Sequence, residues 1–513
     1  MTDCNNAANH FVDRHLSQGR ADKRAFLEAD GLRRDMTYGQ LADQTSRAAA
    51  AYARAGINRE ERVALLVLDQ LEMPVLFWGA LKAGVVPIPL NTLLAAQVYD
   101  VILRDSRAAA LFVSESLYPV VAPVLQGNPF LRRVVVIADS APDGAQTYAD
   151  FMDGCAPAET VETSEDEVAF WLYSSGSTGQ PKGVKHVHGS LCATAETYGA
   201  QVLGIRESDV VYSVAKLFFA YGLGNAMTFP MDAGATTVLF SGRPTPDAAA
   251  DILNTHKPTV FCGVPTLYAA MVHYWEDGKP LPAAPLRTCI SAGEALPEEI
   301  GKKWHALWGV DILDGVGSTE MLHIFLSNRP GDVVYGTSGI PVPGYDVRLV
   351  DEHDQDVAED EVGELLVRGP SAADGYWNQR GKSRSTFEGH WTRTGDKYER
   401  TPQGRYVYCG RTDDMFKVSG IWVSPFEIEQ ALVAFPAVLE AAVVAHHDEE
   451  GLEKPKAYVV LKEGHGAEEL DALKEFVKQK IGKWKYPRWV EIVPDLPKTA
   501  TGKIQRFKLR EGA

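Results

Sequence analysis

The chain has 513 residues, which exceeds the size at which a single hydrophobic core keeps growing, so at least two domains are expected. Hydrophobic residues make up 45% of it, and 68 acidic side chains outnumber 51 basic ones to give a formal charge of −17. Nucleic acids and anionic membranes favour basic surfaces, so this balance argues against both as main partners. A phosphate-bearing substrate would have to be held by local basic residues and backbone amides.

Neither export nor membrane insertion is predicted. The N-terminus, MTDCNNAANHF, has no basic stretch followed by an apolar one, and the longest apolar region, residues 63–90, is interrupted by Asp69, Glu72 and Lys82. The cysteines include no CxxC pair, so neither a disulfide framework nor a zinc site is indicated. They are Cys4, Cys155, Cys192, Cys262, Cys289 and Cys409. A reducing cytoplasm is therefore the expected compartment.

The first part of the chain alternates short apolar strands with helical patterns. Thr37 opens the sequence T-Y-G-Q, which predicts a capping box and a helix that closes at Gly56. Strands are then predicted at residues 63–68, 85–90, 109–113 and 134–137. Continuous apolar strands between helices indicate a parallel sheet that is covered on both faces.

A second series of the same kind is predicted to begin at Tyr173, after an apolar strand at residues 168–172. Its candidate strands are residues 235–240, 259–262, 288–291 and 310–313. Alternating strands at residues 345–350 and 364–368 flank an acidic turn and predict a small antiparallel sheet or barrel. The fold class is therefore α/β: a large N-terminal domain of two α/β layers plus a small β subdomain, residues 1–412, and a small α+β C-terminal domain, residues 413–513.

A run of hydroxyls, glycines and one lysine follows the strand at residues 168–172. Residues 173–184 read YSSGSTGQPKGV. Glycines let backbone N–H groups point into one concavity, hydroxyls donate to phosphate oxygens and a lysine adds positive charge, so the run predicts a phosphate grip. It is not the P-loop of ordinary NTPases, and a near match from Gly375 to Ser383 is one residue too long. A solvated linker is the alternative interpretation.

The order of residues 173–184 closely resembles the phosphate loop of the adenylate-forming superfamily, which contains the acyl-CoA synthetases, firefly luciferases and adenylation domains of nonribosomal peptide synthetases. Further stretches are similar to its other signatures, in the same order, and the resemblance runs from about residue 20 to the end. They are SAGEALP at 291–297, DGVGSTE at 314–320, WTRTGD at 391–396, GRTDDMFKVSGIWVSPFEIE at 410–429 and PKTATGKIQR at 497–506.

This resemblance implies an ATP site. The implied nucleotide-binding residues are Ser174, Ser175, Gly176, Thr178, Lys182, Gly293, Glu294, Asp314, Gly315, Thr319, Asp396 and Arg411. In the superfamily the residue matching Thr319 meets the α-phosphate, those matching Asp396 and Arg411 meet the ribose, and the one matching Glu320 binds Mg²⁺, a hard ion that suits oxygen ligands. Lys503 matches the catalytic lysine, and Thr319 and Glu320 complete the implied catalytic set.

The chemistry of the superfamily explains why these groups are needed. A carboxylate that attacks the α-phosphate of ATP must overcome repulsion between anions, so catalysis is chiefly positioning and charge neutralisation. Lys503 would bridge the two anions, and the mobile C-terminal domain would then turn about the hinge Asp413 to admit a thiol. Gly420 would line the tunnel for the arm of CoA, and Lys485 would contact a CoA phosphate. ATP and CoA are the implied co-substrates, and Mg²⁺ is the implied cofactor.

Two stretches beside these motifs indicate which acid is activated. KLFFAYGLGN at 216–225 and GSTEMLHIFLSN at 317–328 closely resemble the benzoate-CoA ligase group and its hydroxybenzoate relatives. The match implies a flat aromatic slot lined by Ala220, Tyr221, Ala292, Gly317, His323 and Ile324 and bordered by Lys417. His323 would place a donor near the substrate carboxylate. A satisfied interior histidine is the alternative, as core packing is for the aromatic residues of the first stretch.

The expected activity is therefore ATP-dependent ligation of benzoate to CoA through an aroyl adenylate, by a monomer or homodimer. A ligase for 4-hydroxybenzoate or another substituted benzoate is the alternative, because a single polar group can accept or reject a ring hydroxyl. An amino-acid adenylation module is disfavoured, since residues 216–225 contain no acid for the ammonium group. A luciferase-type oxygenase remains open. A non-catalytic nucleotide-binding regulator is disfavoured by the presence of Lys503, Glu320 and Asp396 together.

Overall fold

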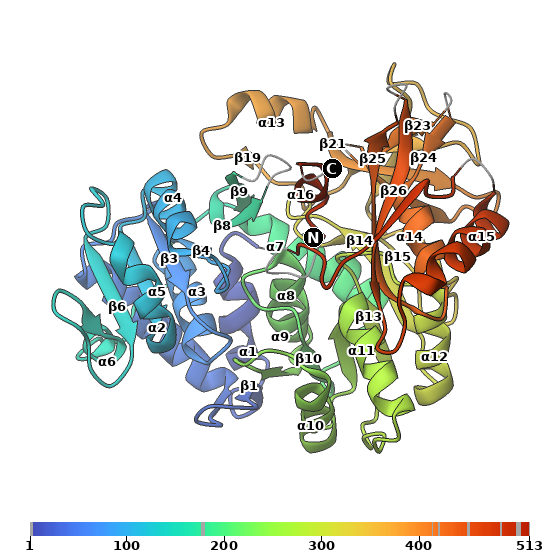
Figure 1. The fold of residues 1–513 in the computed structure, drawn as a ribbon. Coiled ribbons are helices and arrows are strands. Elements are labelled where there is room, and N and C mark those ends of the chain that lie inside the picture. The colour runs from blue at the N-terminus through green and yellow to red at the C-terminus, as the bar shows by residue number, and fades with distance from the viewer. Residues whose placement is uncertain are drawn as a thin grey trace. The chain divides into compact units, whose positions relative to one another are not determined.

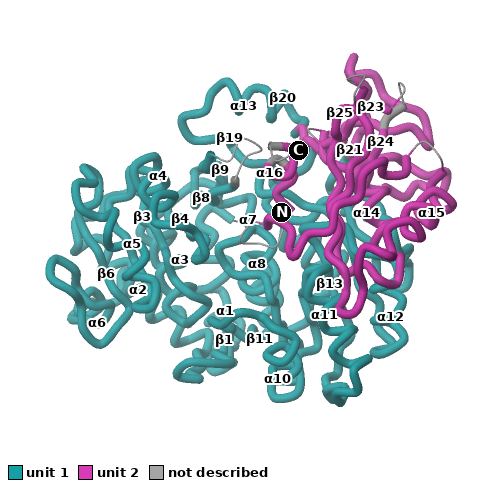
Figure 2. The backbone as a smooth tube through the Cα atoms, viewed as in Figure 1, with its two compact units in different colours: residues 1–346, 367–392 teal, residues 347–366, 393–513 magenta. Residues whose placement is uncertain are grey.

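The structure is a computed structural model that describes residues 4–175, 180–412, 414–418, 421–448, 452–482, 485–498 and 504–511. It forms two compact units, which Figure 2 shows in different colours. Unit 1 contains Met1–Asp346 and Val367–Thr392, and unit 2 contains Val347–Leu366 and Arg393–Ala513. Contacts thus group residues 347–366 and 393–412 with the C-terminal region, whereas the sequence places the boundary at residue 412. That boundary stays a prediction.

The first sheet of unit 1 is parallel and has the strand order β4-β3-β5-β6-β7. Figure 1 labels β3, β4 and β6 of this sheet. Its strands are β3 (Arg62–Leu66), β4 (Val86–Pro89), β5 (Ala110–Ser114), β6 (Arg133–Ile137) and β7 (Gln146–Thr147). The accompanying helices are α2 (Tyr38–Arg54), α3 (Glu72–Lys82), α4 (Ala96–Ser106), α5 (Tyr118–Val121) and α6 (Tyr148–Met152). The predicted capping box is confirmed, because Thr37 and Gln40 exchange side-chain and backbone hydrogen bonds at the start of α2.

Both faces of this sheet are covered, as the apolar strands predict. Leu111 and Val113 of β5 pack in one cluster with Ile102 of α4. Phe112, which lies between them and points to the other face, meets the rings of Tyr52 in α2 and Phe151 in α6 at centroid distances of 5.5 and 4.9 Å. Alternate residues of one strand therefore hold helices on both sides.

The second sheet of unit 1 has the order β16-β15-β14-β13-β12-β10-β11-β1-β2. Its strands are β1 (Arg24–Glu28), β2 (Asp35–Thr37), β10 (Val210–Ser213), β11 (Thr236–Leu239), β12 (Val260–Gly263), β13 (Thr288–Ser291), β14 (Ile312–Gly317), β15 (Ile324–Ser327) and β16 (Ile340–Pro341). The strands from β1 through β14 pair in parallel, whereas β2, β15 and β16 pair antiparallel. The turn between β14 and β15 brings residues 317–324 to this end of the sheet.

Helices and π-helical turns surround the second sheet. They are η1 (Asn9–Asp13), α1 (Arg14–Ser17), α7 (His188–Thr194), η4 (Ala195–Leu203), α8 (Ala220–Leu223), η5 (Gly224–Thr228), α9 (Phe229–Ala233), α10 (Pro246–His256), α11 (Pro265–Glu276) and α12 (Glu298–Trp308). One apolar cluster joins Phe261 of β12 to Tyr268 of α11 and Trp304 of α12. This packing fixes the strands from which the candidate site emerges.

A third, small sheet carries the predicted phosphate grip. It has the order β19-β9-β8, with β8 (Val168–Ser175), β9 (Pro181–Val187) and β19 (Gly375–Tyr376), and all its pairs are antiparallel. The expectation that the grip begins the second parallel series is wrong, because β8 and β9 form a separate antiparallel sheet with β19. β8 ends at Ser175 and β9 begins at Pro181. This connection is long enough for a hairpin of antiparallel strands but too short for the crossover that two parallel strands require. The helix α13 (Arg380–Thr386) and strand β20 (Phe387–Glu388) follow β19.

Unit 2 contains antiparallel strands and a small α+β body, as the sequence predicts. The strands are β17 (Asp346–Val350), β18 (Gly363–Arg368), β21 (Trp391–Arg400), β22 (Tyr406–Arg411), β23 (Phe416–Val418), β24 (Ile421–Val423), β25 (Val438–His447), β26 (Glu453–Leu461) and β27 (Trp489–Ile492). The helices are α14 (Pro425–Val433), η6 (Ala467–Glu469), α15 (Leu470–Ile481) and α16 (Arg506–Glu511). The sheet β25-β26-β27 packs on α14 and α15 through Ile428, Val443 and Leu473.

One expectation about the cysteines is wrong. Cys4 and Cys192 are joined in a disulfide across a sequence separation of 188 residues. Cys155, Cys262, Cys289 and Cys409 are free and buried. The pair escapes sequence analysis because only the tertiary fold brings the start of the chain to α7. Among the described helices, none has the length and apolar character that crossing a membrane requires.

Candidate active site

Three side chains of unit 1 meet beside the phosphate grip. Lys182 comes from β9, Glu320 from the turn after β14, and Tyr376 from β19. The Tyr376 hydroxyl donates to Glu320 Oε1 at 2.8 Å, and Lys182 Nζ lies 3.5 Å from the same oxygen. Lys182 Nζ also donates to the Tyr376 hydroxyl at 3.4 Å and lies 4.5 Å from the centre of its ring. The structure therefore brings together the predicted phosphate lysine and the predicted metal ligand.

Tyr376 is a site residue that sequence reasoning missed. In the sequence its segment is part of the near match to a P-loop, and no spacing relates it to Glu320. Strand pairing supplies the relation, because Tyr376 lies opposite Val184, two residues beyond Lys182 on β9. A predicted strand next to the grip would have pointed to Tyr376. The strand β19 has only two residues, which are too few for such a prediction.

The backbone after β14 is fixed by a second residue that was not predicted to act there. His186 of β9 donates from Nε2 to the carbonyl of Thr319 at 2.9 Å, and its ring stacks on Phe170 at 5.2 Å. Burial lowers the pKa of His186 to about 4, so its imidazole is neutral near pH 7. The carbonyl of Glu320 in turn accepts from Ala373 N at 2.8 Å. The Thr319–Glu320 segment is thus held from β9 and from the segment that leads into β19.

The hairpin strand β8 is anchored at its far side. The Tyr173 hydroxyl donates to Asp105 of α4 at 2.6 Å, and burial raises the pKa of this hydroxyl, so it stays protonated. Ser174 follows, and within the described residues its buried hydroxyl has no hydrogen-bond partner. Ser175 ends the strand. Gly176 and Thr178, also predicted to bind phosphate, lie outside the described residues.

Four of the predicted nucleotide-binding residues lie at the ends of two neighbouring strands, β13 and β14. Gly293 follows β13 with a φ of 99°, a left-handed conformation that favours glycine, and Glu294 next to it is exposed. Asp314 of β14 accepts from Leu296 N at 3.2 Å, and burial raises its pKa to about 8. Gly315 packs against β15 so closely that a Cβ there would lie 2.7 Å from the Leu326 carbonyl oxygen. These residues shape one edge of the sheet.

Two residues predicted to line the aromatic slot, Tyr221 and His323, contact each other. The Tyr221 hydroxyl lies within hydrogen-bond distance of the carbonyls of Gly263 and Ile290, at 3.0 and 3.2 Å. His323 Nε2 lies 3.3 Å from the Tyr221 carbonyl, and the two rings stack with centroids 5.7 Å apart. Of the other predicted lining residues, Ala292 and Ile324 are buried, and Ala220 precedes Tyr221 at the start of α8.

His323 sits in an aromatic environment that determines its charge. The rings of Tyr198 and Phe229 lie 5.2 and 4.5 Å from its own. Burial lowers the pKa of His323 to about 3, so the imidazole is neutral near pH 7. Because Nε2 serves the Tyr221 carbonyl as a donor, Nδ1 is the acceptor in that tautomer. Gly317 leaves room for this segment, since a Cβ there would lie 2.5 Å from the His323 carbonyl oxygen.

Unit 2 holds the predicted ribose residues. Asp396 of β21 and Arg411 of β22 are register partners, and Arg411 Nη1 lies 2.9 Å from Asp396 Oδ1. Lys485, the predicted CoA contact, is paired with Glu427 at 2.6 Å. Lys417 lies on β23. The predicted Asp413, Gly420 and Lys503 lie outside the described residues.

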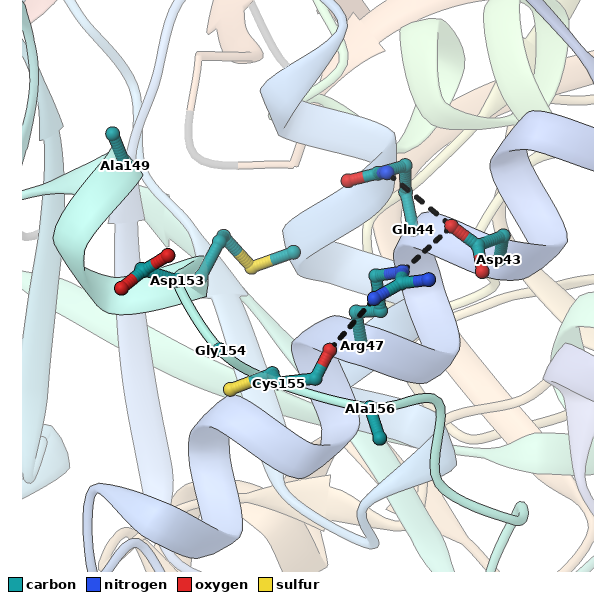
Figure 3. A pocket seen from close by; sticks show the side chains of 9 residues that line it. Asp43, Gln44, Arg47, Ala149, Asp153, Gly154, Cys155 and Ala156 are labelled. Carbon is teal, nitrogen blue, oxygen red and sulfur yellow. Dashed lines mark hydrogen bonds and ion pairs between the residues drawn. The ribbon is translucent and has the colours of Figure 1, made fainter.

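Two surface hollows are lined by other residues. A groove of about 650 Å³ in unit 1 is lined by α2, α6 and the segment after α6, and Figure 3 shows Arg47 within it, bound to Asp43 and to the Cys155 carbonyl. A pocket of about 320 Å³ in unit 2 is lined by Asp414, Met415, Phe416, Ala445, His446, His447, Glu453 and Arg510. Neither hollow contains a residue predicted for the site.

Comparison with known proteins places the chain in a family. The profile described as AMP-binding enzyme matches residues 12–377, and that described as AMP-binding enzyme C-terminal domain matches residues 427–503. The chain is 52% identical to a 4-hydroxybenzoate–CoA/benzoate–CoA ligase of Rhodopseudomonas palustris, over 99% of this chain and 94% of the relative. It is also 52% identical to a benzoate–CoA ligase of Thauera aromatica, over 98% of this chain and 95% of that relative.

A solved structure agrees with these relatives. A benzoate CoA ligase from Burkholderia xenovorans LB400 superposes with a TM-score of 0.90 at 50% identity, covering 98% of this chain and 99% of the other. Both family profiles, the full-length identity and the shared fold lead to one conclusion. The chain belongs to the family of AMP-binding enzymes.

Proposed function

We propose that this protein is an ATP-dependent benzoate–CoA ligase, which converts benzoate, ATP and CoA to benzoyl-CoA, AMP and diphosphate through benzoyl adenylate. One observation carries the proposal: residues 317–324 connect the Lys182–Glu320–Tyr376 cluster directly to the slot at Tyr221 and His323. A carboxylate on an aromatic ring in that slot would therefore lie beside the phosphate-binding groups. The 52% identity to two ligases named for benzoate supports the same acid.

A ligase for 4-hydroxybenzoate is the alternative, because the relative from Rhodopseudomonas palustris is named for both acids. The rings around His323, from Tyr198, Tyr221 and Phe229, provide aromatic faces that suit an unsubstituted ring. A ring hydroxyl would need a polar partner among these residues, and an unpaired hydroxyl would lower affinity.

Glu320 fits the magnesium ligand that the proposal requires. Its side chain is 17% exposed and presents carboxylate oxygens next to a phosphate-binding lysine. The described residues contain no group of three or more His, Cys, Asp or Glu that could hold a metal ion, so Glu320 would share the ion with substrate phosphates and water. When bound, Mg²⁺ neutralises charge on the phosphates of ATP.

In the first half-reaction, an oxygen of benzoate attacks the α-phosphorus of ATP, and the bond to the leaving diphosphate breaks. Lys182 supplies positive charge to the phosphates, and the slot at Tyr221 and His323 orients the ring so that its carboxylate faces the nucleotide. Lys503 would neutralise the attacking carboxylate and the α-phosphate. No protein side chain is acylated.

In the second half-reaction, the sulfur of CoA attacks the carbonyl carbon of benzoyl adenylate, and AMP leaves. Lys503 would block this approach, so the C-terminal domain would turn at Asp413 and present Gly420 and Lys485 to CoA. Asp396 and Arg411 would hold the ribose. The neutral His323 avoids a competing charge beside the acyl group. We place this reaction in the cytoplasm, where ATP and CoA are both supplied; a monomer or homodimer stays a prediction.

CoA-dependent AMP release with ATP and Mg²⁺ tests the proposal. We would compare kcat/KM for benzoate, 4-hydroxybenzoate, 3-hydroxybenzoate, 2-aminobenzoate, cyclohexanecarboxylate and a medium-chain fatty acid. Benzoate should have the highest kcat/KM, and the fatty acid should be a poor substrate because the proposed slot is flat. If a hydroxybenzoate has the highest kcat/KM, the ligase reaction stands and the preferred acid is that hydroxybenzoate instead of benzoate. No AMP release with any of these acids would overturn the ligase assignment.

A further inference from the structure

We infer that Tyr376 is a positioning residue for adenylate formation, whose hydroxyl keeps Glu320 and Lys182 apart so that each can meet Mg²⁺-bound ATP. The inference rests on the proposed function, because it assigns a role within the first half-reaction. Tyr376 would touch neither benzoate nor CoA. Its effect would be exerted through the two charged side chains that it contacts.

The geometry places the Tyr376 hydroxyl between two opposite charges. It donates to Glu320 Oε1 at 2.8 Å and accepts from Lys182 Nζ at 3.4 Å, while Lys182 Nζ stands 3.5 Å from the same Glu320 oxygen. A direct charge-assisted hydrogen bond between an ammonium and a carboxylate would be shorter, at roughly 2.7–2.9 Å. The hydroxyl therefore lies where the Lys182 ammonium and the Glu320 carboxylate would otherwise approach each other directly.

Tyr376 is itself firmly held, which a positioning role requires. Its backbone pairs with Val184 of β9, its N–H donates to Ser383 Oγ at 3.0 Å, and its ring contacts Phe387 at 5.3 Å. The whole residue is 5% exposed. Pairing with β9 also ties it to the strand that carries Lys182, so the tyrosine and the lysine keep a fixed separation.

Removing the Tyr376 hydroxyl would favour the pairing of Lys182 with Glu320 over the binding of phosphate and Mg²⁺. Without it, Glu320 loses a donor and can approach Lys182, and this closer ion pair must be broken before either group can bind Mg²⁺ or phosphate. The cost would fall on ATP binding and adenylate formation. Attack of CoA on a preformed adenylate uses neither Mg²⁺ nor diphosphate, so that step should be spared.

The variant Tyr376→Phe tests this, because it keeps the ring and its packing. We expect kcat/KM for Mg²⁺-bound ATP in adenylate formation to fall about 10- to 100-fold, the effect of losing a hydrogen bond to a charged group. The KM for benzoate and the rate of benzoyl-CoA formation from synthetic benzoyl adenylate should stay within about two-fold of the wild type. Isothermal calorimetry of ATP binding, with Mg²⁺ and with EDTA, should show weaker binding in the absence of any turnover.

Two comparisons separate positioning from a loss of stability. Tyr52→Phe removes a buried hydroxyl on α2 that donates to the Leu76 carbonyl of α3 at 3.1 Å, and it should leave both half-reactions and ATP binding unchanged. In a double-mutant cycle, Tyr376→Phe should have little further effect in the Glu320→Gln background, because the tyrosine acts through that carboxylate. Thermal unfolding would show whether each variant is folded under the assay conditions.

The outcomes are distinct. Unchanged ATP binding and adenylate formation in Tyr376→Phe would overturn the inference, as would equal losses in both half-reactions or additive effects with Glu320→Gln. Failure of the wild type to adenylate any aromatic acid would overturn the proposed function instead. The calorimetric comparison of ATP binding would still decide the role of Tyr376 in that case.

Discussion

Burial determines the charge of several ionisable side chains around the candidate site. The imidazole of His323 is neutral because burial lowers its pKa to about 3, and burial raises the pKa of Asp314 to about 8. Asp69 belongs to the same group, since its Oδ1 accepts from the backbone N–H of Leu217 at 3.2 Å, just before the segment that carries Tyr221. Near pH 7 His323 and Asp314 are therefore neutral, whereas Asp69, whose pKa burial raises only to about 6, is mostly ionised.

Asp69→Asn should change how stability depends on pH. Burial raises the pKa of Asp69 from 3.8 to about 6, so between pH 4 and 6 the native state keeps a proton that the unfolded chain loses. The contribution of Asp69 to the free energy of unfolding is therefore greatest below pH 4, falls as pH rises to 6, and is constant above pH 6. Asparagine removes this contribution, so the variant should gain up to roughly 3 kcal/mol relative to the wild type across that window.

Urea unfolding of Asp69→Asn and wild type at several pH values between 4 and 7 measures this difference. Asparagine retains an oxygen that can accept from the Leu217 N–H. The variant therefore differs from the wild type chiefly in the loss of the titrating carboxyl group. A stability difference that stays constant over this pH range would contradict the prediction.

At the level of elements, β14 and β15 approach each other closely beside the proposed acyl slot. A Cβ on Gly317 would lie 2.5 and 2.7 Å from the carbonyl oxygen and carbon of His323, and these backbone atoms cannot rotate away. Gly317→Ala should therefore displace His323, raise the KM for benzoate more than that for ATP, and cost roughly 1–3 kcal/mol of stability. Steady-state kinetics with each substrate varied in turn would measure the two KM values.

Gly381→Ala is the matched control. Gly381 lies in α13, and nothing stands within 4 Å of a Cβ added there. This variant should keep both KM values and gain slightly in stability, because alanine favours a helix over glycine. If Gly317→Ala behaved in the same way, the slot would not depend on the approach of these strands.

At the scale of the whole molecule, the Cys4–Cys192 disulfide ties the start of the chain to α7. Protein purified without reductant and then denatured should show four reactive thiols, and six after reduction, because the other four cysteines are free. Reduction should also lower the free energy of unfolding, typically by about 2–4 kcal/mol for such a cross-link. Six thiols before reduction would contradict the bond. Disulfides are rare in a reducing cytoplasm, so the count also tests that expected compartment.

Lys503→Ala should separate the two half-reactions of the complete enzyme. Loss of its charge is expected to slow benzoyl adenylate formation by roughly 10²- to 10³-fold and to spare CoA attack on synthetic benzoyl adenylate. Lys498→Ala is a control from the same region, since Lys498 pairs with Glu440 at 2.6 Å within unit 2. Rapid-quench measurement of each half-reaction would decide, and unimpaired adenylate formation in Lys503→Ala would contradict the role.

Much of the fold followed from local sequence. The alternation of apolar strands and helices gave the first sheet, and Thr37 gave the start of α2, because hydrophobic period and capping depend on residues close together in the chain. The hairpin of β8 and β9 was missed because the direction of strand pairing depends on the partner strand, which composition does not identify.

For the candidate site, the sequence by itself determined the residue types and their order, including Lys182, Glu320 and His323, and with them the family. The tertiary structure alone decided that Tyr376 meets Glu320 from 56 residues away and Lys182 from 194, and that His186 holds the Thr319 carbonyl. The physical reason is that motifs and periodicity record neighbours along the chain. Contacts between distant segments arise only when strand pairing and burial bring them together.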